Sequence, residues 1–260
     1  MKRRDFMAAS CLAGLAPLGS VAMAQNADTK KQYYELRLYE LASPAKQEAF
    51  IEFLGKAAIP AMNRLGIEPV GVFKIIESDT PSPNLYVLMP HKSLESAATA
   101  NRRMMADDAF IKAGAAVLDA PKSDPGYKRI VSSLMVAFDG IPQLEIPSKK
   151  ASRVFQLRTY ESHNATKAVK KVAMFNEGGE IDIFRRTGLP PVFFGETLIG
   201  PQMPNLTYML GFDDMAAKEA GWAKFLADPA WTKLKTDPQY KDTVSGITNI
   251  MLSPAACSQI

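Results

Sequence analysis

Two stretches, Tyr34–Glu40 (YELRLYE) and Phe155–Glu161 (FQLRTYE), decide the fold, because they carry one motif 121 positions apart. Three further pairs of matching stretches follow in the same order: Arg64–Val70 with Arg186–Val192, Pro83–Leu85 with Pro204–Leu206, and Ala106–Phe110 with Ala227–Trp231. Four matches in chain order, at an offset of 121 or 122, are not expected by chance. The sequence therefore predicts two copies of one module, joined head to tail.

Both copies show the same order of helical and strand periodicity. In the first copy we expect strand 33–40, helix 44–65 with a kink at Pro60, strands 70–76 and 85–89, a helical region 93–118 broken near Ala106–Asp107, and strand 130–138. In the second copy we expect strand 154–161, helix 165–187 interrupted at Gly178–Gly179, strands 192–199 and 206–211, helix 214–226, and strand 247–252.

Strand, helix, strand, strand, helix, strand is the order of a ferredoxin-like module. Helices cover one face of such a sheet and leave its other face bare, so two copies can bury both bare faces against each other. We therefore predict an α+β fold with two tandem ferredoxin-like modules, residues 33–139 and 153–252, packed sheet to sheet as a barrel within one chain. Residues 140–152, with two prolines, two lysines and two serines, form the predicted linker.

The first 24 residues resemble an export signal. Lys2, Arg3 and Arg4 make a basic start, residues 7–23 are mostly apolar, and Ala22–Ala24 is an A-x-A cleavage site. The paired arginines followed by an apolar pair are typical of the twin-arginine signal, with an ordinary secretory signal as the alternative. We expect a signal peptide over residues 1–24, a mature chain in the periplasm or secreted, and no membrane association after cleavage.

Composition bears on the partners and on the source of stability. Removal of residues 1–24 leaves 28 basic and 26 acidic residues, which gives no electrostatic reason to expect nucleic acid as a partner. Cys257 is the only cysteine in the expected mature chain, so no intramolecular disulfide is predicted. Stability must come from apolar cores, which a hydrophobic content of 47% can supply.

The first-strand motifs Glu35–Tyr39 and Gln156–Tyr160, with Pro204-Asn205 and Ala227–Trp231, resemble the NIPSNAP family over about residues 33–252. The resemblance implies the dimeric α/β-barrel architecture, here as a tandem pseudo-dimer. That superfamily includes cofactor-free monooxygenases, haem-degrading enzymes, lactone isomerases and members with no known activity. The resemblance brings no established set of catalytic residues, and the fold alone does not supply a function.

The polar face of the two first strands is the strongest candidate site. If Leu36 and Leu38 pack on the helices, the alternate residues of both first strands point into the barrel. The candidate ligand-binding residues are Arg37, Tyr39, Arg158, Tyr160, Lys74 and Glu196. Two arginines beside two tyrosines suit a carboxylate or another anion. Internal ion pairs are the alternative, because charges enter a closed interior only when they are paired or hydrated.

Three functions stay open on this basis. The favoured one is binding of a small polar or anionic metabolite inside the barrel. The second is a cofactor-independent monooxygenase or isomerase, with Glu196, Glu35 or a tyrosine as proton carrier. The third is a scaffold without a ligand. The sequence does not decide whether the protein is an enzyme, and it is compatible with a higher oligomer.

No cofactor or metal is predicted. His91 ends a strand and His163 lies in a connection, whereas a metal site needs several ligands at a recognisable spacing. Haem-degrading relatives carry an axial histidine on a helix, and neither histidine is expected within a helix, which makes haem an unfavoured cofactor. No phosphate-binding glycine loop or G-x-S-x-G motif is present.

Overall fold

The structure is a computed structural model that describes residues 30–76 and 82–260. The expected signal peptide, residues 1–24, lies outside the described residues. Over the described ranges, no helix combines the length and the apolar character that crossing a membrane requires.

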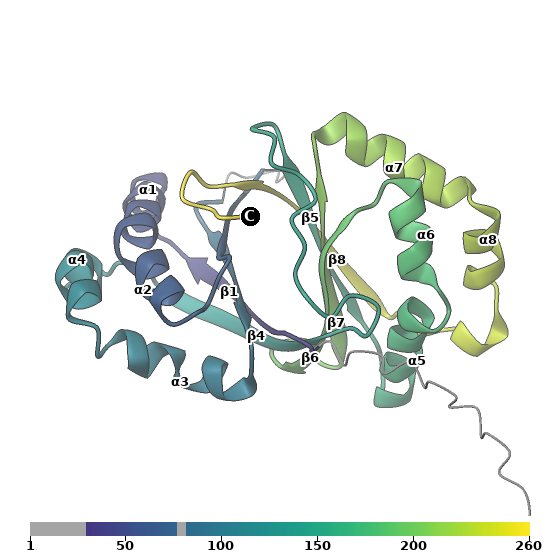
Figure 1. The fold of residues 1–260 in the computed structure, drawn as a ribbon, viewed down its shortest axis with the longest axis horizontal. Helices are drawn as coiled ribbons and strands as arrows, with labels where there is room; N and C mark the ends of the chain where they lie inside the picture. Colours follow the sequence, from purple (N-terminus) through teal and green to yellow (C-terminus); the bar gives the residue numbers. More distant parts are fainter. Residues whose placement is uncertain (1–29, 77–81) are drawn as a thin grey trace, which may run out of the picture.

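The described residues form a closed antiparallel barrel of eight strands, flanked by helices (Figure 1). The strands are β1 (Tyr33–Glu40), β2 (Gly71–Ile75), β3 (Leu85–His91), β4 (Arg129–Ala137), β5 (Val154–Glu161), β6 (Pro191–Ile199), β7 (Asn205–Phe212) and β8 (Gly246–Pro254). Their order around the barrel is β1-β3-β2-β8-β5-β7-β6-β4, and β4 pairs with β1 to close it.

The barrel consists of two equivalent half-sheets. The strands β1 to β4 form one half and β5 to β8 the other. Two equivalent pairings join the halves, since the second strand of each half pairs with the last strand of the other, as β2 with β8 and β6 with β4. The connection between the halves follows the barrel, where the Glu145 N–H donates to the Val192 carbonyl. The predicted fold class, two ferredoxin-like modules packed sheet to sheet, is confirmed.

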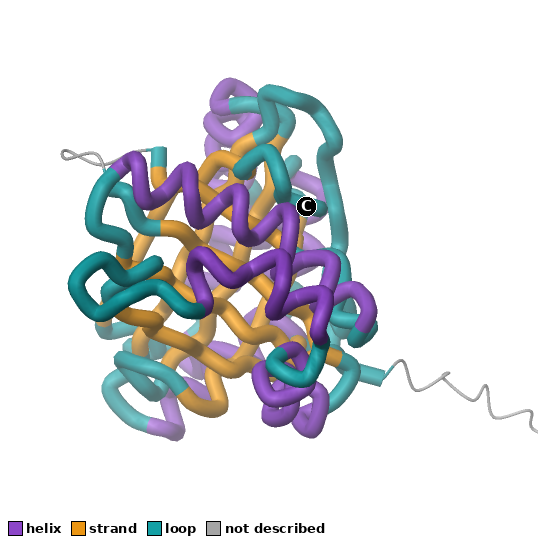
Figure 2. Tube along the Cα trace, turned by 90° about the vertical axis from the view of Figure 1, so that its left-hand side faces the viewer, coloured by secondary structure: helices purple, strands orange, loops and turns teal. Residues whose placement is uncertain are grey.

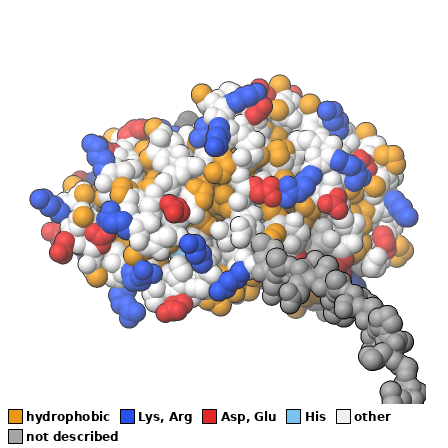
Figure 3. Space-filling model, viewed as in Figure 1, with side chains coloured by type: hydrophobic (Ala, Val, Ile, Leu, Met, Phe, Trp, Pro, Cys, Tyr) orange, Lys and Arg blue, Asp and Glu red, His pale blue; other side chains and the backbone are white. Residues whose placement is uncertain are grey.

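The helices lie in two groups on opposite sides of the barrel (Figures 1 and 2). The first half carries α1 (Pro44–Phe53), the π-helical turn η1 (Leu54–Ala58), α2 (Ile59–Arg64), α3 (Leu94–Met104) and α4 (Asp108–Leu118). The second half carries α5 (Ala165–Asn176), α6 (Glu180–Thr187), α7 (Met215–Ala227), α8 (Pro229–Lys235) and the short 3₁₀ helix η2 (Pro238–Tyr240). Basic and acidic side chains are interspersed over the face seen in Figure 3.

Local sequence explains where the helices begin and break. The Asp107 side chain accepts the Phe110 N–H and starts α4, as expected of an N-cap, so the predicted break near Ala106–Asp107 is confirmed. Gly179, at φ +79°, separates α5 from α6, as the predicted interruption required. The distortion expected at Pro60 lies one turn earlier, in η1. Pro60 itself occupies the first turn of α2, where its missing N–H leaves no hydrogen bond unmade.

Three apolar cores stabilise the molecule. The barrel interior is filled by side chains from both halves, among them Tyr34, Leu36, Phe155 and Leu157. One further core lies between the first half-sheet and its helices and includes Tyr39. The matching core of the second half includes Tyr160.

The orientation predicted for the first strands is therefore wrong. Leu36 faces the barrel interior, whereas Tyr39 and Arg37 face the helices of the first half. The physical reason is that apolar side chains from both halves fill the interior around Leu36, so charged groups would lose their hydration there. The space between sheet and helices reaches solvent and accommodates them, since the Arg37 side chain is 20% exposed and that of Glu35 12%.

Candidate functional site

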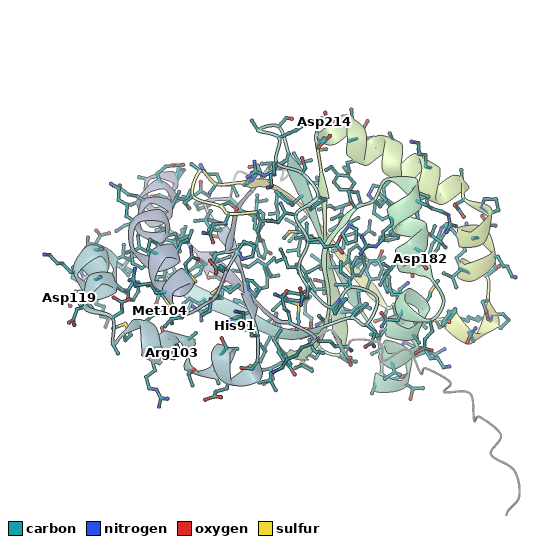
Figure 4. The ribbon with its side chains drawn as sticks, in the orientation of Figure 1. His91, Arg103, Met104, Asp119, Asp182 and Asp214 are labelled. Atoms are coloured by element: carbon teal, nitrogen blue, oxygen red, sulfur yellow. The ribbon has the colours of Figure 1, made fainter. Side chains whose placement is uncertain are left out.

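A cavity of about 340 Å³ lies between the sheet and the helices of the first half. Its floor consists of residues of β1, β3 and β4, and its walls of residues from α1, η1, α2, α3 and α4. Apolar side chains dominate the lining, and the polar groups are Arg37, Tyr39, Asn101 and the Tyr127 phenol. Figure 4 marks Met104, at the end of α3 in the cavity wall, and His91, at the end of β3. Ligand pockets typically have such a volume and such a lining.

The polar corner of the cavity is a connected network. The Arg37 guanidinium donates twice to Glu35, from Nε to Oε1 at 2.6 Å and from Nη2 to Oε2 at 3.1 Å. Arg37 Nη1 also donates to the Tyr39 hydroxyl oxygen at 3.3 Å. Ser132 Oγ donates to Glu35 at 2.9 Å, and His91 Nε2 lies 3.7 Å from the same carboxylate. The positive charge of Arg37 is thus neutralised next to the cavity.

Burial and hydrogen bonding fix the protonation states in this corner. Burial raises the pKa of Glu35, but the interactions with His91, Arg37 and Ser132 outweigh burial and bring that pKa to about 2. Burial raises the pKa of Tyr39 above its ordinary value, although Arg37 opposes the shift. At neutral pH the carboxylate is therefore charged, and the phenol is neutral.

The Glu35 network should make the protein sensitive to acid. The folded-state pKa of Glu35 is lowered from 4.5 to about 2, so its stabilisation is complete above pH 4.5 and is lost as the pH falls towards 2. The free energy of unfolding should drop over this range by up to about 3 kcal/mol more than in Glu35→Gln. Urea titrations at stepped pH measure this, with Glu48→Gln on α1 as the exposed control. Equal pH dependence in wild type and Glu35→Gln would contradict the assignment.

The equivalent space in the second half is filled by aromatic side chains. In the first half, Val72 and Val87 face each other across β2 and β3. Their counterparts by the repeat, Phe194 and Tyr208, are stacked with ring centroids 4.7 Å apart and planes at 3°. Asn101, which lines the open cavity, corresponds to Trp222, which packs against the second core.

The polar groups of the second half are also used internally. The Arg158 guanidinium lies over the ring of Trp222, 4.8 Å from its centroid, and over the ring of Tyr160. Gln156, the counterpart of Glu35, accepts a hydrogen bond from Trp222 Nε1 at 2.6 Å. The Tyr160 hydroxyl bonds that of Tyr208 at 2.9 Å. Each of these contacts involves a side chain that fills the space between the second half-sheet and its helices.

The six predicted ligand-binding residues do not converge. Arg37 and Tyr39 line the first cavity, while Arg158 and Tyr160 belong to the filled second half. Lys74 bonds Glu48 on α1 at 2.6 Å. On β6, Glu196 lies in register with Val136 and Leu206 and does not line this cavity, which removes its expected place beside the arginines.

Prediction from the sequence missed Val87 and Asn101. Both line the first cavity, and neither belongs to a residue type that suggests a binding site. A signal was nevertheless present in the repeat, because the second copy carries Tyr208 and Trp222 at these positions. Where one copy carries a small residue and the other a large aromatic residue at the same position of the repeat, the two copies fill different volumes.

The comparisons with known proteins agree with this fold. The sequence matches the NIPSNAP family over residues 34–120 and 155–259. No curated protein matches the chain. A candidate monooxygenase from Fusobacterium nucleatum has a similar structure, with a TM-score of 0.56, 10% identity and coverage of 86% of this chain and 92% of that chain.

Two further solved structures show the same likeness. A candidate monooxygenase from Lactobacillus acidophilus has a TM-score of 0.55 at 9% identity, covering 86% of this chain and 94% of that one. An anthrone oxidase-like protein has a TM-score of 0.52 at 14% identity, with coverage of 86% and 92%. At such identities the likeness shows a shared fold. By its sequence match, which extends over both halves, this chain belongs to the NIPSNAP family.

Proposed function

We propose that the cavity of the first half binds a small, mostly apolar, uncharged molecule that carries one hydrogen-bonding group. The observation that carries this proposal is the difference between the halves, since one repeat fills the space with aromatic rings and the other leaves about 340 Å³ open. At about 30 Å³ per water-sized group, the open space accommodates roughly ten non-hydrogen atoms.

The charges around the cavity support an uncharged ligand. Glu35 already neutralises Arg37, so an anion would have to compete with a two-bond ion pair. The Tyr39 oxygen accepts a hydrogen bond from Arg37, which leaves the phenolic proton free to be donated. A carbonyl or hydroxyl oxygen of the ligand would be its natural acceptor.

The contacts give less support to the catalytic alternative. A carboxylate with a pKa of about 2 is a weak general base at neutral pH, and Glu35 is in addition held by Arg37. Of the other candidate proton carriers, Glu196 does not line the cavity, and Tyr39 lines it with a pKa that burial raises, so its phenol stays protonated at neutral pH. A ligand-free scaffold describes the second half better than the first. Given the signal-like residues 1–24, we propose that binding takes place in the periplasm or outside the cell.

The test uses three probes of similar size, 2-naphthol, naphthalene and 2-naphthoate. We expect 2-naphthol to bind about 2- to 10-fold more tightly than naphthalene, the range that one hydrogen bond supplies. The charged 2-naphthoate should bind more weakly than 2-naphthol. Val87→Tyr with Asn101→Trp, which introduces the residues of the second copy, should weaken 2-naphthol binding at least 100-fold. Fluorescence titration measures all of these affinities.

Arg103→Trp is the matched control, because it adds the same ring to an exposed position of α3 that does not line the cavity (Figure 4). It should leave the affinity for 2-naphthol unchanged. Equal binding of 2-naphthol by wild type and by the Val87→Tyr/Asn101→Trp variant would refute the proposed site.

A further inference from the structure

A second cavity, of about 330 Å³, adjoins the first on the outer side of α1 and α4. Three side chains, Phe50, Phe53 and Val117, line both cavities. We name these three side chains the partition. The two cavities together have twice the volume of the inner one, and nothing but the partition is common to both linings.

Two glycines lie directly against the partition. A Cβ at Gly114 would stand 2.8 Å from Cε2 of the Phe53 ring, and a Cβ at Gly126 would stand 2.7 Å from Cγ1 of Val117. Any other residue at either position would therefore push a partition side chain out of its place. Gly114 lies inside α4, where glycine costs about 1 kcal/mol relative to alanine. Its contact with Phe53 accounts for a glycine at this position.

The backbone next to the partition is irregular. The π-helical turn η1 starts at Leu54, directly after Phe53, and the Ile59 N–H donates to the Leu54 carbonyl. Single π-helical turns occur frequently at functional sites, because they interrupt the regular packing of a helix. Phe53 is thus held by a locally widened helix on one side and faces a glycine on the other.

The second half has no such partition. The counterparts of Phe50 and Phe53 are Lys171 and Met174. Lys171 Nζ contacts Met174 Sδ at 3.3 Å and donates to Glu180 at 2.8 Å, and all three side chains are buried. These polar contacts hold the Lys171 and Met174 side chains in place. Phe50 and Phe53 instead contact each other and neighbouring aromatic rings.

The outer cavity has an apolar floor and a charged rim. The partition supplies the floor, and the exposed alanines at 49, 113 and 116 add apolar surface above it. Lys46, Glu52 and Lys56 supply the rim, where Lys46 pairs with Asp124 and Lys56 with Glu52. A group that stays hydrated is favoured at the rim, and hydrocarbon is favoured beneath it.

From these observations we infer that the partition moves aside to join the two cavities into one binding site for an elongated amphipathic molecule. The apolar body of the ligand reaches the inner cavity, and its polar end stays at the rim beside Lys46, Glu52 and Lys56. This inference rests on the proposed function and specifies its ligand class, a linear molecule longer than the inner cavity alone accommodates.

Straight-chain primary alcohols of 8, 10, 12 and 14 carbons, which are amphipathic and uncharged, provide the test by displacing 2-naphthol. With joined cavities, affinity should keep rising about fourfold per methylene up to the longest chain. A plateau at about ten carbons, the capacity of the inner cavity, would overturn the inference while leaving the proposed function intact. Absence of 2-naphthol binding in wild type would instead remove the proposed function.

Ala116→Trp fills only the outer cavity, so it distinguishes a joined site from binding in the inner cavity alone. It should leave the affinity for 2-naphthol unchanged and abolish the gain from 10 to 14 carbons. Ala115→Trp, at the adjacent exposed position that does not line the cavity, should behave as wild type with every chain length. Retention of the full chain-length gain in Ala116→Trp would count against the joined site.

Discussion

Glu180→Leu should destabilise the protein by about 3–5 kcal/mol, because it leaves the Lys171 ammonium buried without a partner. The Lys171 Nζ and Glu180 Oε2 atoms are 2.8 Å apart, and their side chains are only 5% and 2% exposed. The ammonium also lies 4.3 Å from the centroid of the Phe175 ring, so it has no path to water without disturbing the aromatic core. Urea denaturation of wild type and variant at neutral pH measures the loss.

The double variant Lys171→Met/Glu180→Leu is the decisive comparison. Removing both charges removes both desolvation costs, so its stability should return to near that of wild type or exceed it. An exposed pair gives the contrast, since Lys56→Met should change stability little. Should the single and double variants lose equal stability, the loss would come from packing at Glu180 and not from an unpaired charge.

Phe194→Ala should cost about 3–5 kcal/mol and should also create a second binding cavity. Phe194 is fully buried and contacts the rings of Phe138, Phe175, Phe184 and Tyr208. Its removal should leave an apolar space next to Tyr208, and such spaces stay dry and accept small aromatic molecules. We therefore expect benzene, which has the six carbons of the lost ring, to bind the variant with two sites instead of one.

The neighbouring residue supplies a matched control. Phe193 is also fully buried, but its side chain faces the barrel interior, where it contacts Tyr34. Phe193→Ala should lose a similar amount of stability and should open no space in the layer between sheet and helices. Thermal unfolding and titration with benzene distinguish the two variants. A single binding site in Phe194→Ala would show that the second half collapses around the missing ring.

The sequence predicts the fold well because the repeat and the periodicities are local signals. It does not predict which face of β1 meets the helices, because alternation defines two faces without saying what covers each. Tyr34 and Leu36 share one face, and Tyr39 adds an aromatic ring to the polar one, so both faces look capable of packing. Packing of the two halves settles the question, since the apolar cluster that they form inside the barrel excludes Glu35 and Arg37.

The site is harder to predict for a different reason. A cavity is defined by side chains that are small where they could be large, such as Val87 and Asn101, and no motif identifies such residues. The π-helical turn after Phe53 also has no composition signal of its own. Comparison of the two copies position by position would have indicated the cavity, because Tyr208 and Trp222 occupy the aligned positions.

The pairing of β2 with β8 and of β4 with β6 has a consequence for how such a protein can evolve. In a symmetric homodimer each mutation occurs in both subunits, so a residue that fills one cavity fills the other as well. Here both halves of the barrel belong to one chain, and a mutation enters only one of them. Selection can then fill the second half for stability and keep the cavity of the first half open, without a compromise between the two.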